Sequence, residues 1–130
     1  MDTLIWNGFQ IQGNTKELDF IAESEGHINL EKDDIISTLS AEGGNYVASG
    51  VASDLNGAFK LAVNNLNVNM KDVKRMLVQF VCGRQQADMG ELRSVTDVLN
   101  EASPEISLIW GIASDSALGE DFKVIILLGE

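Results

Sequence analysis

The apolar residues of this chain form two kinds of run, some spaced as on one face of a helix and some nearly continuous. The clearest helix is predicted over residues 54–66, because its apolar positions recur three or four residues apart and share one face. Those positions are Leu55, Ala58, Phe59, Ala62, Val63 and Leu66. Ser53 is placed to cap the free amides of this helix. We therefore expect an amphipathic helix that covers a strand layer.

A second helix is predicted over residues 89–102, after the capping pair Asp88 and Glu91. Its apolar positions also share one face, and they are Met89, Leu92, Val95, Leu99 and Ala102. Pro104 prevents the helix from continuing, because proline lacks an amide hydrogen and its ring clashes with the preceding turn.

The first 25 residues are predicted to form a hairpin and a short helix. Asn7-Gly8 separates two short apolar stretches, and Asn-Gly favours a hairpin because both turn positions need a positive φ. Asn14 and Glu17 then have the spacing of a capping box. The helix that follows is expected to bury Leu18, Ile21 and Ala22.

Four nearly continuous apolar runs predict buried strands. They are Tyr46–Val51, Arg75–Val81, Ile106–Ala113 and Phe122–Leu128. The first consists mostly of small residues, so another element can pack closely against its backbone. The last two at first suggest a hairpin, but residues 114–121 connect them with about eight residues, whereas hairpin loops take two to five. From residue 45 onward the predicted order is β-α-β-α-β-β.

Length and charge exclude several classes of protein. The 130 residues suit one domain with its own core, and the apolar runs are too short to span a bilayer. A net charge of −11 argues against nucleic acid and anionic membranes as partners, because both are negatively charged. Cys82 is the only cysteine, which excludes an internal disulfide and suits a reducing compartment. We therefore expect a cytoplasmic protein without a secretory signal.

Four stretches of the chain resemble, in the same order, motifs of the bacterial tubulin homologue FtsZ. Gly26-His-Ile-Asn-Leu-Glu-Lys-Asp-Asp-Ile resembles its loop-and-helix motif, and Ser49-Gly-Val-Ala-Ser fits its small-residue strand. Val78-Gln-Phe-Val-Cys-Gly fits a following strand, and residues 110–124 fit a fourth motif without a gap. The resemblance covers about residues 26–130 and concerns only the C-terminal domain of the FtsZ/tubulin family.

The resemblance implies an α+β fold in two layers, with two helices on a mixed four-stranded sheet. Its strand order is 1-4-2-3, and the last strand is antiparallel to its neighbours. Phe122–Leu128 would then be central, with Ile106–Ala113 at an edge, so the hairpin interpretation gives way. Residues 1–25 are expected to precede the domain of residues 26–130 as an extension of hairpin and helix.

The family-matched residues that could carry chemistry lie in the loop before a further predicted helix, which begins after Asn29 and runs to about Ser40. In the family, the acids that match Glu31 and Asp34 reach the nucleotide bound by the next subunit of a filament and help to position the attacking water. Asn29 matches a residue of the same loop. Carboxylates suit this work, and three-residue spacing puts both on one helix face. The alternative is structural, because acids in a first turn favour the helix dipole.

The chain departs from the family at three positions of this loop. Glu31 stands where the family has an aspartate, which adds one methylene of reach. Lys32 stands where the family has an aromatic residue, and Asp33 where it has a small one.

No stretch matches the Gly-Gly-Gly-Thr-Gly-type phosphate loop of the family's GTP-binding domain. We therefore expect no intrinsic GTPase activity, no cofactor and no metal, and a stand-alone protein-interaction or assembly module. Its expected partner is a cell-division or cytoskeletal GTPase of the FtsZ/tubulin type, or a second copy, contacted through residues 26–34. Two alternatives stay open: a small-molecule-binding protein or enzyme with a site between subunits, and a degenerate domain with a structural role.

Other candidate residues make weaker patterns. His27 and Glu31 are four residues apart, but two ligands do not make a metal site. One loop contains three acids, Asp115, Glu120 and Asp121, which suit either a weak cation or a solvated connection. Trp6 and Trp110 are interpreted as core or interface residues.

Overall fold

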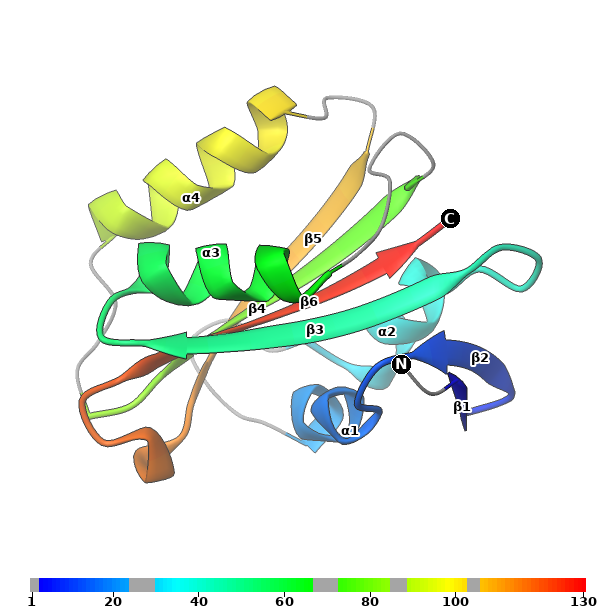
Figure 1. Cartoon of the computed structure of the whole chain (residues 1–130), viewed down its shortest axis with the longest axis horizontal. Helices are drawn as coiled ribbons and strands as arrows, with labels where there is room; N and C mark the ends of the chain where they lie inside the picture. Colours follow the sequence, from blue (N-terminus) through cyan, green and yellow to red (C-terminus); the bar gives the residue numbers. More distant parts are fainter. Residues whose placement is uncertain (1–2, 24–29, 67–72, 85–88, 103–105) are drawn as a thin grey trace.

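Four strands of eight residues each form the main part of one sheet in the computed structural model of the chain (Figure 1). They are β3 (Asn45–Ala52), β4 (Arg75–Cys82), β5 (Ser107–Ser114) and β6 (Phe122–Gly129). The structure describes residues 3–23, 30–66, 73–84, 89–102 and 106–130.

The last strand, β6, lies between β3 and β4 and is antiparallel to both along its whole length. β5 pairs with β4 in parallel and ends the sheet. Among these four strands the order is therefore 1-4-2-3, as the resemblance implied. Every residue of β6 except Lys123 is buried, which confirms a central final strand and excludes the hairpin interpretation.

The N-terminal hairpin extends the same sheet, so the sheet has six strands where four were expected. β1 (Thr3–Trp6) and β2 (Phe9–Gln12) pair across a turn in which Asn7 and Gly8 both have positive φ, 50° and 88°. β2 then joins β3 through one parallel pair, Gln12 with Tyr46. Gly13 permits this approach, because a Cβ there would collide with the carbonyl oxygen of Val47.

Helices cover both faces of the sheet, which makes three layers where two were expected (Figure 1). α3 (Leu55–Asn65) and α4 (Met89–Ala102) lie on one face, and α1 (Lys16–Glu23) and α2 (Lys32–Thr38) on the other. The second face is covered mainly by buried residues from the first third of the chain: Ile11, Leu18, Ile21, Leu30, Ile35 and Leu39. No helix in the described ranges is long and apolar enough to cross a membrane.

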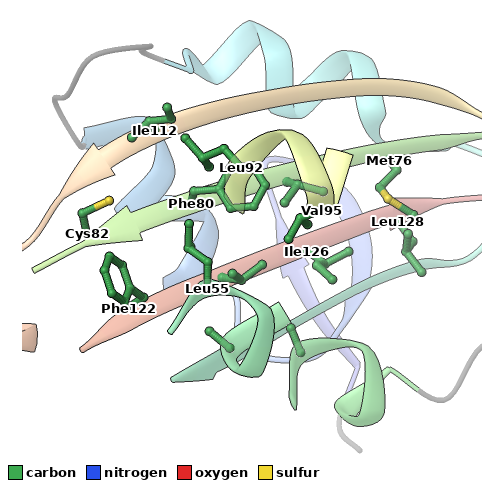
Figure 2. Close-up of a cluster of buried hydrophobic side chains, with 14 of the residues drawn as sticks. Leu55, Met76, Phe80, Cys82, Leu92, Val95, Ile112, Phe122, Ile126 and Leu128 are labelled. Atoms are coloured by element: carbon green, nitrogen blue, oxygen red, sulfur yellow. The ribbon is translucent and has the colours of Figure 1, made fainter. Parts of the chain in front are cut away.

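Side chains of β6 alternate between the two apolar clusters, as expected for a strand buried on both faces. Val124, Ile126 and Leu128 face α3 and α4, whereas Ile125 and Leu127 face α1 and α2. Figure 2 shows the first cluster, in which side chains of the two helices meet those of the strands: Leu55, Phe80, Leu92, Val95, Ile112 and Ile126.

Two predictions about α3 are wrong. Asp54, not Ser53, caps the helix, because its Oδ1 accepts a hydrogen bond from Gly57 N at 2.6 Å. Val63 was expected to be buried but is 43% exposed, since the contact with the sheet is narrower than the apolar stripe. The buried positions of this helix are Leu55, Ala58 and Ala62.

Glu91 has a different partner from the one predicted, because it caps α3 instead of its own helix. Its Oε1 accepts hydrogen bonds from the backbone amides of Leu55 at 2.6 Å and Asn56 at 3.1 Å. Asp88, its predicted capping partner, lies outside the described residues. The carboxylate thus ties the first turn of α4 to the first turn of α3.

Of the two residues predicted to cap α1, Asn14 does so and Glu17 has another partner. Asn14 Oδ1 accepts a hydrogen bond from Lys16 N at 3.1 Å, as a capping residue does. Glu17 instead forms an ion pair with Lys123 of β6 at 2.9 Å. This ion pair attaches the N-terminal helix to the central strand.

Candidate functional site

The predicted loop acids lie at the start of α2. Leu30, 4% exposed, packs in the cluster beneath α1 and α2 and fixes the point where the helix begins. Glu31, Lys32 and Asp33 follow it and are exposed, whereas Asp34 is half-buried. Their carboxylates therefore lie at the surface of the α1–α2 layer.

Asp34 is held by its own helix turn. Its Oδ2 accepts a hydrogen bond from Glu31 N at 2.7 Å, which satisfies one free amide at the helix start. Its backbone oxygen accepts hydrogen bonds from Ser37 Oγ at 2.8 Å and Thr38 Oγ1 at 3.0 Å. Asp34 thus caps this turn through a hydrogen bond, whereas the structural alternative considered for it concerned only the helix dipole.

Trp6 joins the hairpin to both helices beside these acids. Its Nε1 donates a hydrogen bond to Asp19 Oδ1 of α1 at 2.9 Å. Lys32 Nζ lies 5.9 Å from the centroid of the Trp6 ring, a cation–π geometry. A shallow depression of about 290 Å³ is lined here by Trp6, Asn7, Asp19, Ala22, Glu23 and Lys32.

No pattern in the sequence indicates that Trp6 and Asp19 adjoin the predicted site. They are 13 residues apart, and Lys32 is distant from both in the sequence. Only the Asn-Gly turn, which places Trp6 at the end of β1, is a local signal for this arrangement.

The remaining candidates stay apart from this surface. Cys82 is buried, 5% exposed, at the end of β4. Asp115 Oδ1 accepts a hydrogen bond from Ala117 N at 3.0 Å, whereas Glu120 and Asp121 are exposed. Within the described ranges, no three His, Cys, Asp or Glu side chains are grouped as a metal site would require. The predicted residue Asn29, like His27, lies outside the described residues.

The carboxylates at the start of α2 lie on the surface and not in an enclosed pocket, an arrangement that suits contact with another molecule. Glu31 and Asp33 place two exposed carboxylates on the first turn of α2, and Asp34 adds a half-buried one. Carboxylates at such a position can accept hydrogen bonds from a partner or pair with its cations.

A comparison with protein-family models finds no match, and no curated protein matches the chain. Solved structures do match. The chain is similar to FtsZ of M. jannaschii, solved as an empty dimer, with 20% identity and a TM-score of 0.71. The similarity covers 88% of this chain and 35% of that FtsZ chain.

The chain is also similar to TubZ of Bacillus thuringiensis serovar israelensis. A GTPγS-form protofilament of TubZ matches with 15% identity and a TM-score of 0.63, over 87% of this chain and 32% of the TubZ chain. GDP-form protofilaments match with 13% identity and a TM-score of 0.60, over 81% and 30%. The chain therefore has the fold of an FtsZ/tubulin C-terminal domain and spans about a third of the length of these proteins.

Proposed function

We propose that this domain is a protein-interaction or assembly module that docks on a GTPase of the FtsZ/tubulin type. The observation that carries the proposal is a shared fold with a part of TubZ, a protein solved as protofilaments, and with a part of FtsZ, solved as a dimer. The docking surface would be the loop of residues 26–34 and the first turn of α2, with Glu31 and Asp34 directed at the nucleotide site of the partner.

The exposure of this turn supports the proposal. Glu31 is exposed at the start of α2, and Lys32 and Asp33 beside it are exposed as well. Asp34 is fixed by its bond to Glu31 N, so its carboxylate loses little freedom when a partner binds. Asn29 belongs to the proposed surface through the motif alone.

Head-to-tail filaments grow because each subunit has two different complementary surfaces. A chain that has one of these surfaces and lacks the GTP-binding half would bind one filament end and stop growth there. We expect no GTP turnover by the domain itself, because no phosphate-gripping loop is present in its sequence. The proposed setting is the cytoplasm, in cell division or the cytoskeleton.

The test mixes the purified protein with a full-length FtsZ-type GTPase and follows polymer mass by light scattering together with phosphate release. We expect polymer mass and GTP turnover to fall as the protein is added, with an effect already at substoichiometric amounts. The proposal is wrong if neither quantity responds at any stoichiometry. GTP turnover by the purified protein alone, lost in a Glu31→Ala, Asp34→Ala double variant, would contradict the expected lack of activity.

Conservative variants separate contact from folding. Glu31→Gln leaves the backbone amide that Asp34 binds, and Asp34→Asn retains an oxygen to accept that bond. The double variant should keep its fold and lose most of its effect on polymer mass, because both charges are absent. Glu42→Gln is the matched control, because it removes one exposed carboxylate outside residues 26–34 and should retain the effect.

A further inference from the structure

The outer side of β5 is the edge of the sheet, and no strand in the described ranges pairs with it. Ser107 N donates to Lys74 O at 3.0 Å, and Asp115 N donates to Cys82 O at 2.9 Å, so these two amides face β4. Backbone groups alternate in direction along a parallel ladder. The amides and carbonyls of Leu108 and Trp110 therefore point outward from partly exposed residues, where a further strand would pair, whereas Ile112 is only 7% exposed.

Within the described residues, the accessible half of this edge, Ser107–Trp110, lacks the usual protection against another strand, whereas Gly111, Ile112 and Ala113 are buried. Proteins block exposed edges with charged residues, proline or very short strands. β5 has eight residues, Ser107–Ser114, and its sequence Ser-Leu-Ile-Trp-Gly-Ile-Ala-Ser contains neither a charged residue nor a proline. The opposite edge of the sheet, β1, has only four residues.

A groove runs beside this edge, between β5 and α4. It has a volume of about 410 Å³ and is lined by Gly90, Leu92, Arg93, Thr96, Asp97 and Trp110. Trp110 comes from β5, is half-buried, and contacts Phe80 edge-to-face with ring centroids 6.1 Å apart. The groove thus combines an apolar floor with an outward-pointing strand backbone.

The groove carries one positive and one negative side chain, so its charges can pair with those of a second copy of the same groove. Arg93 and Asp97 are exposed, lie one helical turn apart on α4, and line the groove together with Trp110. A two-fold axis that passes near Trp110 reverses the direction of α4, so that Arg93 of one copy faces Asp97 of the other, twice. Since the chain carries a net charge of −11, two copies repel each other least where the facing surface is neutral and paired.

We propose that this edge is a homodimer interface, in which the accessible half of β5, Ser107–Trp110, pairs antiparallel with the same half of a second copy and joins two sheets into one. The α4 helices of both copies then lie antiparallel over the joined strands, with Trp110 near the centre and the Arg93–Asp97 pairs beside it. This interface is distinct from the loop of residues 26–34 and does not rest on the proposed docking function.

The test measures the mass of the full chain by light scattering after size exclusion and by sedimentation equilibrium. We expect twice the 14.1 kDa of one chain at micromolar concentration. Arg93→Asp places two aspartates opposite each other at both contacts, and Asp97→Arg places two arginines there. Each single variant should therefore weaken dimerisation at least tenfold, and the double variant Arg93→Asp, Asp97→Arg should restore it.

Mixing the two single variants gives the sharpest result. Each repels its own copy, but a mixed pair has opposite charges at both contacts, so an equimolar mixture should form heterodimers. Lys60→Asp makes the same change of charge on α3, away from the groove, and should leave the dimer intact. A monomer at all concentrations, or a dimer that ignores the charge reversals, overturns the proposal.

Discussion

At Gly50 the backbone of α3 comes close to that of β3. A Cβ at this position would lie 2.6 Å from Ala62 N and would also collide with the carbonyl oxygen of Ala58. Both atoms belong to the helix backbone, which cannot move aside as a side chain can. Gly50 therefore allows α3 to approach this strand of small residues closely, as was expected.

Gly50→Ala should lower the free energy of unfolding by about 1–3 kcal/mol, because the helix must shift outward and lose packing. Urea unfolding followed by circular dichroism measures this loss. Ser49→Ala on the same strand is the control and should change stability by less than about 0.5 kcal/mol, since the bond from Asn65 Nδ2 uses the Ser49 backbone oxygen. An unchanged Gly50→Ala midpoint would mean that α3 adapts without loss.

At the scale of elements, one ion pair attaches α1 to the middle of the sheet. Lys123 Nζ lies 2.9 Å from the carboxylate of Glu17, and the two side chains are only 21% and 13% exposed. The same ammonium group lies 5.8 Å from the centroid of the Phe20 ring. Limited exposure reduces screening by solvent and salt, so this contact differs from an ordinary surface pair.

A double-mutant cycle with Glu17→Gln and Lys123→Met should give a coupling energy of about 0.5–3 kcal/mol. Each single variant leaves one partly buried charge without its partner. The losses of unfolding free energy in the two single variants should therefore add up to more than the loss in the double variant. Urea unfolding of the four proteins at low and high salt provides the measurement. A coupling energy of zero would show that α1 is held by its apolar residues alone.

At the scale of the whole molecule, the sheet separates two apolar clusters that different parts of the chain supply. Leu18 of α1 belongs to one cluster, and Leu92 of α4 belongs to the other. Since β6 contributes alternate residues to both, loss of either cluster exposes one face of the same strand. We therefore expect residues 1–25 to unfold together with residues 26–130.

Leu18→Ala and Leu92→Ala should each lower stability by about 2–5 kcal/mol through the cavity left behind. Unfolding should stay a single transition, with tryptophan fluorescence and far-UV circular dichroism coinciding. Leu61→Ala, at a site 44% exposed, is the control and should change stability by less than about 0.5 kcal/mol. An early, separate transition in Leu18→Ala would instead indicate that the N-terminal extension unfolds independently.

Local patterns predicted the elements well where neighbours in sequence decide the structure. The helix predicted over residues 89–102 has the same bounds in the structure, and the Asn7-Gly8 turn forms with positive φ at both residues. The central position of the last strand required the family resemblance and the length of residues 114–121. The loop motif predicts the candidate surface only as a stretch of sequence, and the hydrogen bond from Glu31 N to Asp34 was not predicted.

What the sequence alone determined about this protein is the set of strands and helices, the turn residues and the acidity, because these depend on side-chain period and composition. The tertiary structure decided that the hairpin joins the sheet, that Glu91 caps a different helix, and that Trp6 meets Asp19 and Lys32. These outcomes depend on contacts between residues far apart in the chain. Their energies arise only after the layers have packed, so no local pattern encodes them.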